Sequence, residues 1–150
     1  MIREAREEDV GAIADAVEEL LVELGGSRPA RQEVETEVRA ILGDPRAGLL
    51  LVAESDGEIV GVLGASWQRA IHVPGRYALI QDLWVDRAWR SRGIGAELVE
   101  AIAEQARDQG VTRIEVGLPK EDFENIEATE AFYRGNGFEH LGSRMRRLLA

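Results

Sequence analysis

A segment rich in glycine and arginine lies in the middle of the chain, where residues 80–95 are Ile-Gln-Asp-Leu-Trp-Val-Asp-Arg-Ala-Trp-Arg-Ser-Arg-Gly-Ile-Gly. Its first six residues are mostly apolar and predict a strand, while apolar residues then recur once per helical turn at Ile94, Leu98, Ile102 and Ala106. The start of a helix leaves backbone N–H groups without intrahelical partners, and its dipole makes that end positive. We therefore expect the turn between strand and helix to bind an anion.

The spacing Arg90-x-x-Gly93-x-Gly95 favours a pyrophosphate group. Glycine lets an anion approach the backbone closely, and arginine supplies forked donors that suit phosphate oxygens. The segment is neither a Walker A loop nor a dinucleotide fingerprint, because it lacks the lysine of the first and does not follow the first strand. The alternative is a glycine-rich turn with solvated arginines. We expect a helical φ at both glycines, so valine at either position should leave the protein folded.

The apolar periodicity around this segment predicts a mixed α/β sheet in the order βααβββαβαββ, within a single domain of residues 1–150. Helices are expected at residues 10–24 and 31–42 and from Ile94 to a stop at Gly110. A further helix is expected after the polar stretch 119–125 and ends at about Asn136. The dipeptide Asp56-Gly57 predicts a hairpin, and the strand–helix–strand order before residue 118 predicts a parallel pair. The expected strands are 2–6, 49–54, 58–68, 77–85, 112–118 and a terminal hairpin split at Gly142-Ser143.

The composition excludes several classes of protein. There is no cysteine, which rules out disulfides, thiolate metal sites and cysteine nucleophiles, and the two histidines, His72 and His140, are too far apart in sequence to suggest a metal site. A net charge of −10 argues against binding of nucleic acid or an anionic membrane. No apolar run approaches the length of about 20 residues that crosses a bilayer, and the N-terminus is charged, so we expect a cytoplasmic protein.

Residues 80–95 closely resemble motif A of the GCN5-related N-acetyltransferase (GNAT) family, whose signature is Arg/Gln-x-x-Gly-x-Gly/Ala after an apolar strand. Residues 132–138, Phe-Tyr-Arg-Gly-Asn-Gly-Phe, are similar to the second motif of that family, and the opening Ile2-Arg3-x-Ala5-x-x-x-Asp9 is typical of many members. The resemblance covers essentially the whole chain. It implies a GNAT-like acyl-CoA N-acyltransferase fold and an acetyl-CoA-dependent N-acetyltransferase.

The resemblance also implies where acetyl-CoA binds, namely between two strands that diverge at Leu83–Val85 and 112–118. The pantetheine arm would hydrogen-bond to the backbone of Leu83 and Val85 like an added strand, and the pyrophosphate would bind the N–H groups of residues 92–96. Asn125 lies eight residues before Tyr133, one more than in many members. The expected cofactor-binding residues are Leu83, Trp84, Val85, Arg90, Ser91, Arg92, Gly93, Ile94, Gly95, Ala96 and Asn125.

Two residues are candidates for catalysis. By the same resemblance, the hydroxyl of Tyr133 would protonate the departing thiolate; the alternative is a tyrosine that only packs against the sheet. Asp82 is the acid nearest to motif A and is the candidate general base, although strict alternation places it on the face opposite Gln81, Leu83 and Val85 unless a bulge intervenes. A structural carboxylate at Asp82, a water relay and another acid such as Glu23 are the alternatives.

These residues predict direct attack of an amine on the thioester. No covalent acyl-enzyme is expected, because there is no cysteine and no convincing serine–histidine pair. The acceptor would be a small-molecule or peptide amine, and acids of the first helix would favour a cationic one if they border its cleft. A homodimer through the C-terminal strands is compatible with the sequence. The alternatives are an acyl-CoA-binding sensor of the same fold without activity, and an unrelated nucleotide-binding α/β protein.

Overall fold

A computed structural model describes residues 1–149, which form two compact units that divide after Val116. The first unit holds a five-stranded sheet with three α-helices, and the second begins at Gly117 and holds a fourth α-helix. Among residues 1–149, no helix has both the length and the apolar character needed to cross a membrane. The elements are β1 (Ile2–Glu4), α1 (Val10–Leu24), α2 (Arg31–Leu42), β2 (Gly48–Ser55), β3 (Glu58–Ala70), β4 (Val73–Val85), α3 (Ile94–Asp108), β5 (Ile114–Val116) and α4 (Ile126–Gly135).

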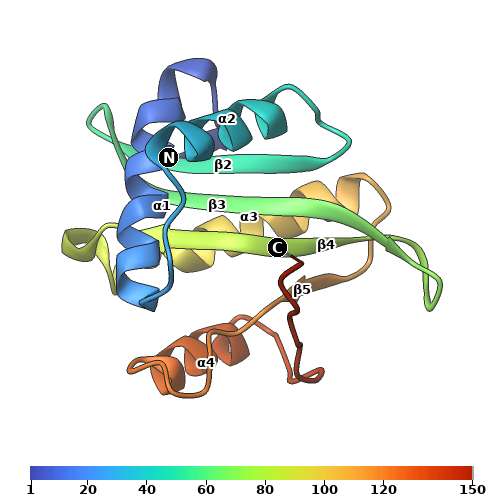
Figure 1. Cartoon of the computed structure of the whole chain (residues 1–150). Helices are drawn as coiled ribbons and strands as arrows, with labels where there is room; N and C mark the ends of the chain where they lie inside the picture. The colour runs from blue at the N-terminus through green and yellow to red at the C-terminus, as the bar shows by residue number, and fades with distance from the viewer. Residues whose placement is uncertain (150) are drawn as a thin grey trace. The chain divides into compact units, whose positions relative to one another are not determined.

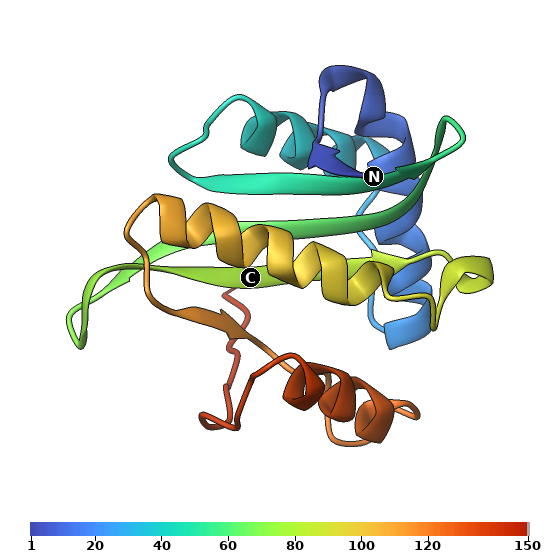
Figure 2. The ribbon, with the colours of Figure 1, turned by 180° about the vertical axis from the view of Figure 1, so that it is seen from behind.

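The sheet of the first unit is mixed and has the strand order β1-β2-β3-β4-β5. All neighbours are antiparallel except β4 and β5, which are parallel as predicted, because α3 carries the chain back across the sheet. The hairpin between β2 and β3 is also confirmed, and its turn residues Asp56 and Gly57 have φ values of 50° and 80°. Helices α1 and α2 cover one face of the sheet and α3 covers the other (Figures 1 and 2).

Each face of the sheet is packed by the apolar stripe that the sequence predicts. On the face of α1 and α2, the core includes Ile13, Val38 and Val62. On the other face, Leu98 and Ile102 of α3 are fully buried. A Cβ at Gly61 of β3 would lie 3.0 Å from the Ile94 side chain and 3.1 Å from that of Leu98. Odd-numbered residues in this part of β3 therefore face α3, and even-numbered ones face α1 and α2.

The mixed α/β architecture is confirmed, but the last two predicted strands are wrong. Residues 138–149 contain no strand, and β5 is shorter than the predicted 112–118. A hairpin is stable only when one of its faces is buried, and a two-stranded one alone is marginal in water. Here the large apolar side chains of the segment stay exposed, namely those of Leu141, Met145, Leu148 and Leu149.

An ion-pair network fixes β1 to the start of α1. The guanidinium of Arg3 donates to both carboxylate oxygens of Asp9, at 2.8 and 3.0 Å, and to Glu54 at 2.9 Å. Asp9 also accepts the backbone N–H of Arg6 at 2.8 Å. The side chains of Arg3 and Asp9 are only 13% and 7% exposed. The hydrogen bonds from Arg3 hold the pKa of Asp9 below its usual value, so the carboxylate is charged in the folded protein.

Replacing Asp9 should therefore destabilise the protein. We expect Asp9→Asn to lower the free energy of unfolding at pH 7 by about 3 kcal/mol, because it leaves a largely buried guanidinium without its main partner. Since the folded pKa of Asp9 is lowered, the deficit should be complete above the unfolded pKa of about 3.9 and should shrink as the pH falls below it. Urea unfolding between pH 7 and pH 3 measures both effects.

The matched control is Glu8→Gln, which removes an exposed carboxylate at 3.4 Å from Arg6. Exposed pairs of this kind contribute at most about 1 kcal/mol, so this variant should unfold nearly as wild type does. Equal losses in the two variants would contradict a special role for the Arg3–Asp9 pair.

Candidate active site

Strand β4 contains a β-bulge at the position where the sequence placed its candidate base. Gly64 of β3 pairs with Asp82, but the next residue, Ala65, pairs with Ile80, so Gln81 is an extra residue on β4. A bulge reverses the alternation of the side chains that follow it. Ile80 lies opposite Ala65 on the α3 face, whereas Asp82 lies opposite Gly64 on the face of α1 and α2. Strict alternation would have placed Asp82 on the α3 face, together with Ile80.

The Asp82 carboxylate is partly buried and is next to open space. Among residues 1–149 it has neither a hydrogen-bond donor nor an ion-pair partner. Burial raises its pKa above the usual value for aspartate. A Cβ at Gly64 would lie 3.4 Å from Asp82 Oδ2 and 3.2 Å from Leu50 Cδ2. A side chain at residue 64 would therefore crowd the Asp82 carboxylate and Leu50.

The edge of β4 after the bulge is not covered by β5. Pairing between the two strands ends at Ile80 and Val116. The Asp86 N–H donates to the Val60 carbonyl at 2.8 Å, so alternation directs the backbone of Trp84 toward β3 and that of Leu83 and Val85 toward the open edge. Among residues 1–149, no strand pairs with Leu83 or Val85 on this side. An amide-bearing ligand could add there like a further strand.

Trp84 differs from its two neighbours. Its side chain is 8% exposed and belongs to the core between the sheet and helices α1 and α2. Its backbone pairs with Val62. Its indole N–H is buried and has no hydrogen-bond partner among residues 1–149. Leu83 and Val85, rather than Trp84, therefore present backbone groups at the open edge.

The turn before α3 presents free backbone donors. The first hydrogen bond of the helix runs from the Glu97 N–H to the Gly93 carbonyl, at 3.0 Å. The N–H groups of residues 94–96 precede it and have no acceptor among residues 1–149. A Cβ at Gly93 would meet nothing within 4 Å. Open space and unsatisfied donors at the positive end of a helix suit an anion.

The backbone of this turn is not helical, contrary to the expectation for its first glycine. Gly93 has a φ of 86° and Ser91 a φ of 64°, both in the left-handed region, whereas Gly95 is the second residue of α3. A β-branched residue at Gly93 would be strained whether or not a ligand binds. Gly95 is therefore the glycine of this turn whose helical backbone accepts a side chain without that strain. Beside the turn, the guanidinium of Arg92 lies over the Trp89 ring, 4.9 Å from its centre.

Arg90 links this turn to β4 and to α1. Its Nε donates to the Val85 carbonyl at 3.0 Å, and its Nη2 donates to Glu23 at 2.6 Å. Glu23 lies in the last turn of α1 and also faces Arg87 at 3.7 Å. Glu23 thus serves as a partner of both Arg87 and Arg90.

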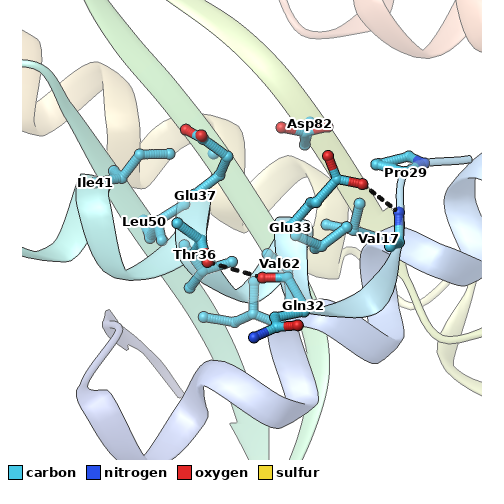
Figure 3. Close-up of a pocket in the computed structure, with 15 residues that line it drawn as sticks. Val17, Pro29, Gln32, Glu33, Thr36, Glu37, Ile41, Leu50, Val62 and Asp82 are labelled. Carbon is cyan, nitrogen blue, oxygen red and sulfur yellow. Dashed lines mark hydrogen bonds between the residues drawn. The ribbon is translucent and has the colours of Figure 1, made fainter.

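A cavity of about 740 Å³ lies between α1, α2 and the sheet (Figure 3). Asp82 belongs to its wall on the side of the sheet, and α2 contributes two further acids, Glu33 and Glu37. Figure 3 shows these two carboxylates on the side of α2 that is turned toward Asp82. The rest of the wall is largely apolar and includes Val17, Ile41, Leu50 and Val62.

The acids of α2 were missed in the sequence, where the acids of α1 were considered instead. No acid of α1 lines the cavity. Glu33 and Glu37 are one turn apart, and each directly precedes a buried valine, Val34 or Val38. The sequence signal that could have identified these two acids is their spacing of one helical turn along the edge of the buried stripe.

The second compact unit holds the other two expected site residues, Tyr133 and Asn125. Tyr133 is buried, and its ring packs edge-to-face on Phe132 and Phe138, with centroids 5.1 and 5.4 Å away. Burial raises the pKa of its hydroxyl to about 12, so the phenol keeps its proton at neutral pH. Asn125 immediately precedes α4, and its side chain makes no capping hydrogen bond.

Comparison with known proteins identifies the family. The model of the acetyltransferase (GNAT) family matches residues 13–138. The chain belongs to the GNAT acetyltransferase family. Members of this family use acetyl-CoA as co-substrate. No curated protein matches the GNAT chain described here.

Solved structures with the same fold cover almost the whole chain. A possible acetyltransferase from Clostridium difficile 630 is 24% identical, with a TM-score of 0.85 over 100% of this chain and 97% of its own. An aminoglycoside antibiotic 6'-N-acetyltransferase from Acinetobacter haemolyticus is 16% identical, with a TM-score of 0.80 and coverages of 100% and 98%. Glucosamine-6-phosphate N-acetyltransferase from Arabidopsis thaliana is 18% identical, with a TM-score of 0.77 and the same coverages. At these identities the likeness establishes the GNAT fold alone.

Alanine at Gly93 and alanine at Gly95, the two glycines at the start of α3, should have different effects on the free energy of unfolding. Gly93→Ala should lower the free energy of unfolding by about 1 kcal/mol, because a side chain is unfavourable at a left-handed φ. Gly95→Ala should leave it unchanged or raise it by up to about 1 kcal/mol, because alanine is the better helix former. Urea unfolding without ligand measures both. A shift of the same sign in the two variants would contradict the backbone conformation described above.

Proposed function

We propose that the protein is an acetyl-CoA-dependent N-acetyltransferase that transfers the acetyl group to a primary amine by direct attack on the thioester. One observation carries the proposal. The open edge of β4 at Leu83 and Val85 is followed, nine residues after Val85, by the unpartnered N–H groups at the start of α3. A strand edge and a helix start in this order offer one continuous binding surface for an amide-bearing arm that ends in a pyrophosphate.

The residues of this surface fit acetyl-CoA. The backbones of Leu83 and Val85 would hydrogen-bond the pantetheine amides, and the N–H groups of residues 94–96 would bind the pyrophosphate, with Arg92 adding positive charge. Arg90 already donates to the Val85 carbonyl, so it helps to fix the edge from which the arm would bind. Acetyl-CoA supplies the activated acyl group, the amine is the nucleophile, and the protein supplies the base and the acid.

The cavity beside Asp82 is the proposed acceptor site. Asp82 is the residue before Leu83, so an amine at its carboxylate is next to the edge along which the thioester would lie. The amine must be neutral to attack, and a free alkyl amine with a pKa near 10.4 is almost fully protonated at neutral pH. Asp82 accepts a proton from the amine, the nitrogen–carbon bond forms, and the carbon–sulfur bond breaks. A carboxylate with a raised pKa is better matched to this task than an ordinary one.

Tyr133 is the proposed general acid. The departing thiolate needs a proton, and a phenol with a pKa of about 12 is protonated and available to donate one. In this scheme the base and the acid are separate groups, and no covalent acyl-enzyme forms. Asn125 would assist the arm or the tyrosine through its free side-chain amide.

The main experiment combines turnover with cofactor binding. Free thiol should appear when acetyl-CoA is mixed with a panel of amines, whereas a sensor of the same fold would bind coenzyme A without releasing thiol. Coenzyme A should raise the melting temperature of wild type, since a ligand at a hundred times its Kd adds about 2.7 kcal/mol. We expect Gly95→Val to stay folded and lose most of this shift, because its side chain would block the anion at the start of α3.

The matched control is Gly11→Val, because Gly11 is the second residue of α1 as Gly95 is of α3. A Cβ at Gly11 would meet only the end of the Arg31 side chain, at 3.9 Å. This variant should keep the shift with coenzyme A. If Gly95→Val also kept it, the pyrophosphate would bind elsewhere and the proposed cofactor site would be wrong.

A second test concerns Tyr133. Loss of a general acid typically costs about 10²–10⁴ in rate. We expect Tyr133→Phe to lower kcat by an amount in that range, while the thermal shift with coenzyme A stays close to that of wild type. An unchanged kcat under conditions where chemistry limits the rate would show that another group protonates the thiolate. A lost thermal shift would instead make Tyr133 a binding residue.

A further inference from the structure

The charges around the cavity are not balanced. Three carboxylates line it, those of Glu33, Glu37 and Asp82, and none of its lining residues is basic. Glu33 accepts the backbone N–H of Ala30 at 3.0 Å and thereby caps α2. Among residues 1–149, Glu37 and Asp82 have no donor at all. Asp82 is partly buried, so its unneutralised charge is costly unless a cation binds beside it, whereas Glu37 is exposed and can attract a cation without that cost.

The arginines of α2 form ion pairs with acids outside the cavity. Arg31 contacts Asp15 at 2.6 Å and Glu18 and Glu35 at 3.5 Å, and Arg39 contacts Glu7 at 2.8 Å. None of these acids lines the cavity. The basic side chains of the helix therefore neutralise the acids outside the cavity and leave the acids inside it unpaired. This pattern favours a positively charged ligand inside the cavity.

The two unpaired carboxylates lie at different depths. Asp82 is partly buried on the sheet, next to Gly64, whereas Glu37 is exposed on α2. The wall shared by the sheet and the helices is apolar, and Leu50 and Val62 are 7% and 2% exposed. A ligand that contacts both carboxylates must place an apolar part against this wall.

We propose that the acceptor is a dication, an amine that carries a second positive charge at the other end of an apolar spacer. The reacting nitrogen binds beside Asp82 and the distant charge binds at Glu37, which makes Glu37 a specificity-determining residue. This inference rests on the proposed function, because it names the substrate class of the same cavity. Alkyl diamines are the simplest members of the class.

The experiment compares diamines with matched monoamines, for example 1,4-diaminobutane with n-butylamine, and repeats the pair at neighbouring chain lengths. Wild type should favour the best diamine by about tenfold in kcat/KM, which corresponds to one charge-assisted contact. Added salt should reduce this preference, since Glu37 is exposed. Glu37→Gln should lose most of it. The control is Glu19→Gln, an equal change of charge on α1 outside the cavity, which should keep the preference.

The outcomes separate this inference from the proposed function. If wild type used the monoamine as well as every diamine, or if Glu37→Gln kept the preference, the dication assignment would be overturned while the transferase stood. Binding of coenzyme A without turnover of any diamine would overturn it too, and would leave the cofactor site intact. Absence of any thermal shift with coenzyme A would overturn the proposed function, and this inference with it.

Discussion

At Gln81, strand β4 carries a residue that has no partner on β3, and the positions of the groups at the site follow from that bulge. At residues 78–80, just before Gln81, β4 pairs with both β3 and β5. After Gln81, the alternation is reversed and, among residues 1–149, no strand pairs with the edge of β4 that faces β5. The bulge thus aims a carboxylate into the cavity on one face, and within three residues the backbones of Leu83 and Val85 lie at an edge that no strand of residues 1–149 covers. Bulges recur next to active sites because they redirect a strand in this way.

Helix α1 and the turn before α3 depend on each other through the pair of Glu23 and Arg90. The N-terminal half of α1 lines the cavity with Ile13 and Val17, and its last turn holds the arginine that donates to Val85. The start of α1 is in turn fixed to the sheet by Arg3 and Asp9. One helix therefore connects the cavity, the strand edge and the N-terminal strand.

Sequence patterns located most elements of the first unit, because the features behind them are local. The stripe of Val34 and Val38 gave α2 its observed bounds, and Asp56-Gly57 gave the hairpin. The bulge could not be predicted, since Gln81 has no local signature and its place depends on pairing with β3. The left-handed φ of Gly93 was missed because glycine is compatible with both conformations. The final hairpin was predicted from its turn residues Gly142-Ser143, without a partner that would bury it.

Residue 64 is a position at which the cavity can differ between related proteins. A methyl group at this position would crowd Leu50 and Asp82, which line the cavity together with Gly64. Substitution of a single residue on a central strand could therefore shorten the inner end of the cavity without altering a loop or a helix. The range of acceptors that fit could then diverge between related chains through one position of the sheet, while the surface proposed for the acyl donor stays the same.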